Sequence, residues 1–484
     1  MSLDLRAIVI FVIAAILYAG LLPARARTWA LFVASVIAIY WLQPALPIRF
    51  SDYILPTAII VMTVTTWGLT RPSGATILRE DRVSLGVVAA LVVGLSFMRY
   101  VRADFRWTAS RPPDPLSVIA ALVIVGAILA GLARLLPGRE PGRVLTTSSL
   151  LMVGLFIVFK AEPLAAGASQ LWRGLTGQDT RLASMADLNW LGFSYVAFRL
   201  IHTLRDRQTG YLPALSLREY ITYVIFFPAY TAGPIDRAER FSQDLRALPD
   251  MTGLDAARFT DGLTRIVIGL FKKIVLADSL AQGMSLNSVN AAQVHSTLWL
   301  WILLYGYALR LYFDFAGYSD IAIGLGLLFG IRLPENFNRP YLKTTITAFW
   351  QSWHMTLSNW ARFYVFLPLS RWWLMRPRKP SPTLIVLSAQ LATMGVIGLW
   401  HGVTVNFVIW GLWHGLALFV HKQWSDHTRR WYRELNGMLW RKRAWTALTW
   451  FVTFQYIVIG WVWFALPGPA QAIQTLARLF GLGR

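Results

Sequence analysis

The sequence has 484 residues, of which 56% are hydrophobic and 14% charged, and its mean hydropathy is +0.49. These values exclude an ordinary soluble globular protein and indicate an integral membrane protein. The formal net charge of +22 would suggest nucleic-acid binding in a soluble domain. Here the basic residues lie between apolar segments, as in cytoplasmic loops, so no nucleic-acid partner is expected. The chain has no cysteine, which excludes disulfides, thiolate metal sites and a cysteine nucleophile.

Apolar runs follow one another along nearly the whole chain, and a run of about 20 residues can cross a bilayer. Over residues 1–160 short loops join them, which predicts a block of N-terminal transmembrane helices. Asp4 and Arg6 at the start favour a retained first span over a signal peptide. Because some later runs are too short to span alone, we expect about ten to thirteen membrane segments. The runs are Leu5 to Leu22, Trp29 to Leu46, Tyr53 to Leu69, Val83 to Val101, Leu116 to Leu136, Leu150 to Phe159, Tyr220 to Tyr230, Leu263 to Leu276, Leu298 to Phe315, Ile321 to Ile331, Leu384 to Trp400, Phe407 to Val420 and Trp445 to Phe464.

The character of the chain changes from about residue 186. Histidines, prolines, glycines and charged residues interrupt the apolar runs, as in FFPAYTAGPIDRAERF (226–241) and LYFDFAGYSDIAIGLG (311–326). Irregular backbone at membrane depth is tolerated only where it is buried in protein or lines a cavity. We therefore expect one integral membrane domain over 1–484, with its site in the second half.

Three charged residues lie inside an apolar stretch of that half. Arg310 and Asp314 are four residues apart, so on a helix they would face each other and could neutralise each other. Asp320 has no such partner within its own turn. Two interpretations remain open, an internal ion pair or participation in a cavity.

The segment 334–368 is rich in aromatic residues. Two prolines bracket Asn336 and Asn338, which predicts a turn, whereas Thr344 to Phe366 has the indoles of an interfacial or re-entrant helix. On that helix His354, which follows Trp353, and Ser358 would lie one turn apart on one face. His354 could anchor the helix through hydrogen bonds or take part in chemistry.

The next predicted element is an apolar hairpin with its turn at HGVTVNF. Basic residues before 384 and between Lys422 and Arg443 place both hairpin ends on the cytoplasmic side, so the turn points away from it. His401 follows Trp400 at this turn and precedes a glycine, which leaves room for close approach. It is either a satisfied core residue or a proton acceptor. Two further histidines, His414 and His202, are interpreted as structural, the second as a surface or packing residue.

Several alternative chemistries lack their motifs. The sequence contains no H-E-x-x-H, no Walker-type phosphate loop and no G-x-S-x-G elbow. No cluster of histidines and acids has metal-ligand spacing, so no metal site is expected.

Taken together, these segments resemble the membrane-bound O-acyltransferase family over roughly residues 186–422. The resemblance rests on FSYVAFR, FFPAYTAGPIDR, FDFAGYSDIAIGLGLLFG, the block from ENFNRPY to WHMTLS, and GLWHG, in that order. GPIDR and WHMTLS are similar to the teichoic acid D-alanyltransferases. The glycine-rich and Trp-rich blocks are similar to the membrane subunits that O-acetylate alginate.

The resemblance implies a fold, a site and a reaction. Helices would form a ring around a funnel or tunnel, His401 would be the catalytic histidine and His354 its partner. Binding or tunnel-lining roles are expected for Trp353, Ser358, Trp400, Asn336, Asn338, Asp314, Asp320 and Arg310.

The implied reaction moves an acyl group from a cytoplasmic thioester to a hydroxyl of an exported polysaccharide or glycopolymer. Acetyl is the preferred acyl group, and D-alanyl is the alternative. The thioester would be acyl-CoA or a loaded acyl carrier protein, and no tightly bound cofactor is expected. A periplasmic or extracellular transferase could be a further partner, and the expected location is the cell (inner) membrane. Two alternatives from other classes are a transporter or flippase using histidine proton relays, and a scaffold for a polymer synthase.

Overall fold

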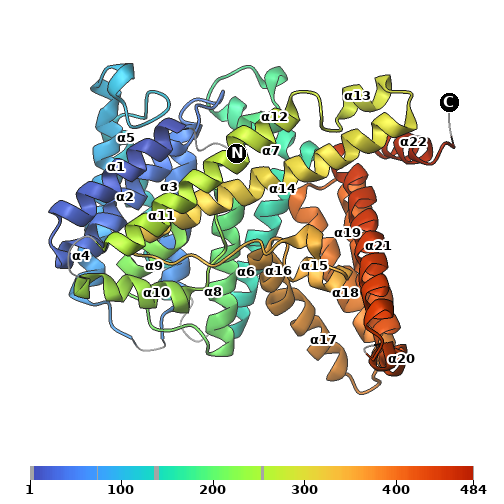
Figure 1. The fold of residues 1–484 in the computed structure, drawn as a ribbon. Helices are drawn as coiled ribbons and strands as arrows, with labels where there is room; N and C mark the ends of the chain where they lie inside the picture. Colours follow the sequence, from blue (N-terminus) through green and yellow to red (C-terminus); the bar gives the residue numbers. More distant parts are fainter. Residues whose placement is uncertain (1–4, 73–74, 136–140, 252–254, 436, 483–484) are drawn as a thin grey trace. The chain divides into compact units, whose positions relative to one another are not determined.

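The computed structural model describes residues 5–72, 75–135, 141–251, 255–435 and 437–482 (Figure 1). All regular secondary structure within these ranges is helical, which confirms the all-α prediction. The chain forms two compact units, Met1–Ile266 with Ala322–Pro334, and Val267–Ile321 with Glu335–Arg484.

Among the described residues, six helices are long and apolar enough to cross a membrane. Two further apolar helices, Leu5–Leu21 and Pro115–Gly131, are shorter. The length and composition of the six long helices fit a multi-pass membrane protein. The six are Ser51–Thr70, Arg79–Tyr100, Gly142–Lys160, Thr297–Leu328, Pro382–His401 and Leu439–Ala465.

The first unit contains the N-terminal helices. Within it α2 packs against α3, α4 and α9, and α8 packs against α3 and α6. The helices are α1 (Leu5–Leu21), α2 (Arg27–Leu42), α3 (Ser51–Thr70), α4 (Arg79–Ser96), α5 (Pro115–Leu135), α6 (Pro141–Lys160), α7 (Glu162–Leu175), α8 (Phe193–Thr209), α9 (Leu217–Ile225), α10 (Ala238–Ala247) and the first part of α11 (Ala256–Leu270).

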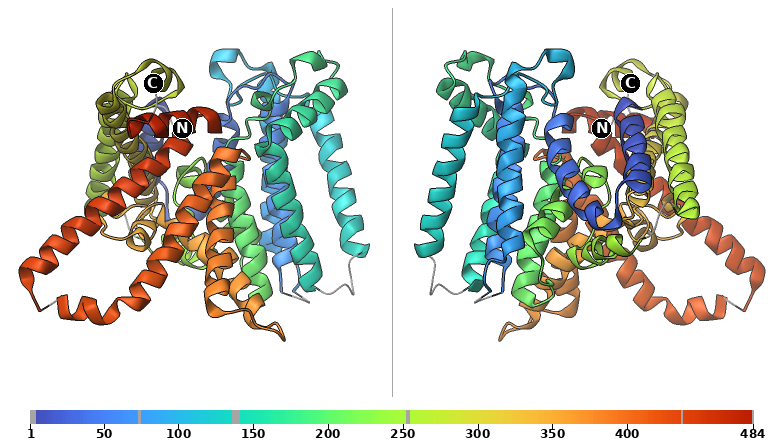
Figure 2. Two further views of the ribbon diagram at one scale, coloured as in Figure 1. Left: turned by 90° about the vertical axis from the view of Figure 1, so that its right-hand side faces the viewer. Right: turned by 90° about the vertical axis from the view of Figure 1, so that its left-hand side faces the viewer.

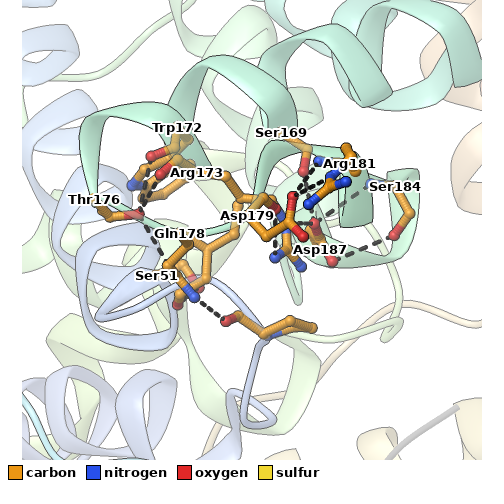
Figure 3. A network of polar contacts seen from close by, with 12 residues as sticks. Ser51, Ser169, Trp172, Arg173, Thr176, Gln178, Asp179, Arg181, Ser184 and Asp187 are labelled. Atoms are coloured by element: carbon orange, nitrogen blue, oxygen red, sulfur yellow. Dashed lines mark hydrogen bonds and ion pairs between the residues drawn. The ribbon is translucent and has the colours of Figure 1, made fainter.

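A polar network fixes α7 to the segment that follows it (Figure 3). Asp187 accepts hydrogen bonds from Arg173 Nε and Ser169 Oγ, each at 2.6 Å. Burial raises the pKa of the Asp187 carboxyl, but the hydrogen bonds from Arg173 and Ser169 outweigh it and lower the pKa to about 2. Gln178 extends the network to the start of α3 by accepting from Arg49 N and donating to Pro47 O. This short helix is therefore held by charge-assisted bonds as well as by apolar packing.

The second unit carries all of the expected site residues. Its long α14 is bonded to the irregular chain that follows it, because Asn336 donates to Ser319 Oγ and Tyr341 donates to Ala308 O. A hairpin of α18 and α19 packs against α21. Its helices are α12 (Asp278–Ala281), α13 (Ser288–Gln293), α14 (Thr297–Leu328, through Ile321), α15 (Ile346–Trp350), α16 (Met355–Ala361), α17 (Leu367–Leu374), α18 (Pro382–His401), α19 (Val405–His427), α20 (Arg429–Leu435), α21 (Leu439–Ala465) and α22 (Pro469–Leu479).

The hairpin confirms its sequence prediction, and its capping residues explain where its helices begin. Ser381 caps α18 by accepting from Leu384 N, and Thr404 caps α19 by accepting from Phe407 N. The close approach of the two helices depends on glycine, because a Cβ on Gly411 would lie 2.5 Å from Met394 O.

Two local expectations were wrong. Leu298 to Phe315 and Ile321 to Ile331 were expected as separate segments, but most of both lies in the single 32-residue α14. Thr344 to Phe366 is not one helix, because it is divided into α15, α16 and the π-helical turn Arg362–Phe366. The basic connection from Lys422 to Arg443 is mostly helical, since α19 continues to His427 and α20 follows. Figure 2 shows α19 and α21 diverging toward α20.

Candidate active site

The segment 336–338, called the NFN segment below, and the turn carrying His354 lie side by side and exchange backbone hydrogen bonds. Met355 N donates to Asn336 O, and Asn338 N donates to Ser352 O, each at 2.9 Å. His354 itself has φ 40° and ψ 54°, a left-handed conformation that a non-glycine residue adopts at a cost. It is the residue before α16 rather than part of a helix. The bonds to the NFN segment hold this conformation.

The Asn336 side chain sets the orientation of the His354 ring. Asn336 Oδ1 lies 3.0 Å from His354 Nδ1 and also accepts from Thr356 Oγ1 at 2.8 Å. Thr356 N also donates to Asn336 Oδ1 at 3.4 Å, and because a backbone N–H can only donate, this contact identifies Oδ1 as the acceptor. His354 Nδ1 must therefore carry the proton in this bond, and Nε2 is left with a lone pair.

His354 Nε2 is buried and has no hydrogen-bond partner in the described part of the chain. Burial lowers the pKa of the His354 imidazole from its usual value of 6.5 to about 3, so the ring is uncharged at neutral pH. Phe315 meets the ring edge to face with centroids 4.6 Å apart. An uncharged, oriented imidazole with an open acceptor can take a hydrogen bond from a substrate hydroxyl or N–H.

His401 is the last residue of α18 and lies in an aromatic enclosure. Its ring centroid is 4.7 Å from that of Phe464, 5.4 Å from Trp410 and 5.9 Å from Phe407. The ring is only partly buried, unlike His354. A Cβ on the following Gly402 would lie 2.8 Å from the Phe407 ring, so any other residue here would displace that ring.

Trp400 lies next to both histidines. Its ring centroid is 5.8 Å from that of His354 and 4.5 Å from that of His401. The fold thus places one tryptophan against two histidines that are 47 positions apart in sequence.

The other expected site residues on this segment have different environments. Trp353 is buried among Phe337, Phe349 and Trp461, with ring centroids 5.2 to 5.5 Å away. The Ser358 hydroxyl donates a hydrogen bond to Trp353 O at 3.1 Å. Its side chain therefore stabilises the turn. The Asn338 side chain is exposed. Their binding or tunnel-lining roles stay predictions.

The three charged residues of α14 are not paired as the sequence suggested. Lys273 Nζ donates to Asp314, and Lys272 Nζ donates to Asp320 Oδ2 at 2.6 Å. Arg310 instead reaches Ser285 Oγ at 3.5 Å. The i, i+4 rule describes neighbours on one helix, whereas a second helical segment supplies the lysines here.

Both lysines lie in the π-helical stretch Phe271–Ala277, and the sequence reading missed them. The available signal was a Lys-Lys pair inside the apolar run from Leu263 to Leu276. Glycines allow the approach, because a Cβ on Gly317 would lie 2.9 Å from Lys273 N. Single-turn π-bulges of this kind frequently occur at functional sites.

Two of the other histidines, His414 and His202, were interpreted as structural from the sequence. His414 is fully buried against Trp350 and Trp410, with ring centroids 5.2 and 5.0 Å away. His202, in the first unit, is buried and lies 3.0 Å from Asp206. The packing interpretation of His202 fits this environment, and the surface alternative was wrong.

No group of three or more His, Cys, Asp or Glu among the described residues could hold a metal ion. Two cavities stand out, one between α6 and α8 and one beside α21. Neither is lined by His354 or His401, so the expected tunnel stays a prediction.

Comparison with known proteins identifies the family. The model of the membrane-bound O-acyltransferase family matches residues 146–462, and the chain belongs to that family. A probable alginate O-acetylase, AlgI, of Pseudomonas fluorescens is 33% identical over 296 residues, which are 60% of this chain and 53% of the relative.

Two other relatives are named for the transfer of different acyl groups, one for acetyl and one for D-alanyl. The peptidoglycan O-acetyltransferase of Helicobacter pylori is 34% identical over 279 residues, 58% of this chain and 50% of that protein. The teichoic acid D-alanyltransferase of Streptococcus thermophilus is 29% identical over 343 residues, 68% of this chain and 76% of that protein. The matches to the acetylating relatives span about half of their length.

Proposed function

We propose that this protein is a membrane-embedded O-acyltransferase that moves an acetyl group from a thioester donor to a hydroxyl of an exported polysaccharide or glycopolymer. The observation that carries the proposal is the arrangement of two histidines around Trp400, one with a fixed tautomer and an open acceptor atom. Family membership and two relatives named as O-acetylating proteins support the acyl group and the acceptor class.

In the proposed reaction His401 is the general base. It takes the proton of the acceptor hydroxyl while that oxygen attacks the thioester carbonyl carbon. The C–O bond forms, the C–S bond breaks, and the departing thiolate recovers the proton from His401. General-base assistance of this kind contributes typically about 10²- to 10⁴-fold in rate.

His354 has a different role in the proposal. A hydrogen bond from His354 to the acyl carbonyl oxygen would need a ring N–H that is not already donating. With Nδ1–H committed to Asn336, Nε2 can only accept, so it would orient a substrate hydroxyl or a donor amide N–H instead. The thioester would come from acyl-CoA or a loaded carrier protein on the cytoplasmic side, and a periplasmic or extracellular transferase could act on the product.

D-alanyl transfer is the second candidate, because the match to the D-alanyltransferase covers a larger share of both chains. The test compares cells that lack the gene and carry either the wild type or His401→Ala. Alkali-released acetate and D-alanine are measured on isolated surface polymer, and membrane levels of the two proteins are matched.

Acetate released only with the wild type supports the proposal, and D-alanine selects the second candidate. Ester content that is equal with and without the gene would reject both acyl-transfer candidates, and uptake or lipid-flipping assays would then examine the transporter alternative. Full ester content with His401→Ala would reject the role of His401.

A further inference from the structure

Helix α21 is longer than the apolar core of a bilayer. Its 27 residues extend about 40 Å, against about 30 Å for the hydrocarbon layer. From Ala444 onward the helix contains no charged residue, whereas Arg441, Lys442 and Arg443 form part of its first turns. If the uncharged part crosses the membrane, Lys442 and Arg443 lie at the level of the lipid headgroups.

A cavity of about 560 Å³, widely open at the surface, lies at this end of the helix. One wall is the face of α21 that carries Lys442, Arg443, Ala447 and Trp450, and the other wall includes Leu342. The cavity thus carries two cations, and the rest of its lining is mainly apolar or aromatic, with Thr344 and Thr446 as the polar members.

The two walls are joined by hydrogen bonds, so the cavity is part of the packed second unit. Trp450 Nε1 donates to Tyr341 O at 2.9 Å, and Thr453 Oγ1 donates to Thr344 O at 3.1 Å. Lys442 and Arg443 are exposed and form no ion pair with an acid in the described part of the chain. Their charge is therefore available to an anion.

We propose that this cavity binds an anionic phospholipid. Its phosphate would contact Lys442 and Arg443, and an acyl chain would lie along Ala447, Trp450 and Leu342. Cationic side chains at headgroup level attract anionic lipid, and indoles favour the same boundary. A water-soluble phosphate would use the two cations but leave the apolar wall exposed. A membrane lipid covers both, and it can enter sideways from the bilayer.

The test uses the full-length protein in mild detergent with phosphatidylglycerol, phosphatidylcholine or glycerol 3-phosphate added. Retained lipid is counted by native mass spectrometry, and thermal unfolding is followed in parallel. Wild type should retain phosphatidylglycerol in preference to phosphatidylcholine. The double variant Lys442→Gln with Arg443→Gln should bind phosphatidylglycerol about tenfold more weakly or worse.

The matched control is Arg430→Gln with Arg433→Gln, which removes the same charge from α20, away from the cavity lining. It should bind as the wild type does. Ala447→Phe keeps both cations and fills the apolar part, so it should also weaken binding if the chain occupies that wall. This variant decides the matter if the double variant does not fold. His401→Ala should retain the lipid, which separates this site from the proposed transferase activity.

Three results would overturn the lipid proposal. They are equal retention of the two phospholipids, equal loss in the double variant and its charge-matched control, and complete displacement of the lipid by glycerol 3-phosphate. The last would indicate a simple anion site.

Discussion

Asn336 Oδ1 lies 3.0 Å from Nδ1 of His354 and fixes which ring nitrogen carries the proton. The same oxygen accepts from Thr356, so one amide oxygen organises both the ring and the turn before α16. This bond connects the irregular NFN segment to the chemistry proposed for the site.

Asn336 is expected to act through the orientation of His354 and not by contacting the substrate. Replacing it should therefore reduce activity. Asn336→Ala leaves a buried Nδ1–H unpaired, and we expect acyl transfer to fall by about 10- to 100-fold. Asn336→Asp retains an acceptor and should recover part of the loss. Rates would be measured at equal protein levels in membranes, with unfolding temperature as the control. An unchanged rate in a folded Asn336→Ala protein would contradict the positioning role.

Gly402 offers a test of the His401 enclosure. Gly402→Ala would put a methyl group 2.8 Å from the Phe407 ring, so we expect a stability loss of about 1–3 kcal/mol and displacement of His401. Gly395→Ala is the control, because its Cβ meets no atom within 4 Å and it lies in α18, the helix that ends just before Gly402. Thermal unfolding and transfer rates of both would be compared. Equal behaviour of the two variants would show that the enclosure adapts.

The Lys272–Asp320 pair should matter more for stability than an exposed pair. The Asp320 side chain is only 11% exposed, and Asp320→Asn would leave the Lys272 charge without its partner. We expect a loss of about 1–3 kcal/mol, because a largely buried charge is left unpaired. Lys422→Gln breaks an exposed i, i+4 pair with Asp426 and should change stability by less than about 1 kcal/mol. Unfolding in a denaturant series would measure both.

The Arg173–Asp187 pair predicts a pH dependence in the first unit. The pKa of Asp187 is lowered to about 2, below the usual value near 4, so the unfolded chain binds the proton first as the pH falls. Its stabilising contribution is complete above about pH 4 and is lost as the pH falls toward 2. Asp187→Asn should remove this part of the acid sensitivity and cost about 2 kcal/mol at pH 7. A variant that loses as much stability between pH 4 and pH 2 as the wild type would exclude this residue as the cause.

Sequence reasoning recovered much of the architecture. The hairpin from Pro382 to His427 was predicted from two apolar runs and the residues between them, because length, capping residues and periodicity are local properties. The grouping of His354 and His401 came from a family resemblance, and the fold places Trp400 against both. The hairpin could be predicted because its pattern lies in neighbouring positions of the sequence.

The errors arose where distant segments decide the outcome. A single helix over Thr344 to Phe366 would satisfy local propensity, but the chain leaves the helix after Trp350, and bonds from the NFN segment hold His354 in a left-handed conformation before α16 begins. Likewise Arg310 was the nearest cation to Asp314 in sequence, yet Lys273 reaches it from the π-helical stretch. Composition and local pattern determined that this chain is a helical membrane protein and where most helices lie. Only the tertiary structure decided which buried donor meets which acceptor, because that depends on contacts between segments far apart in the chain.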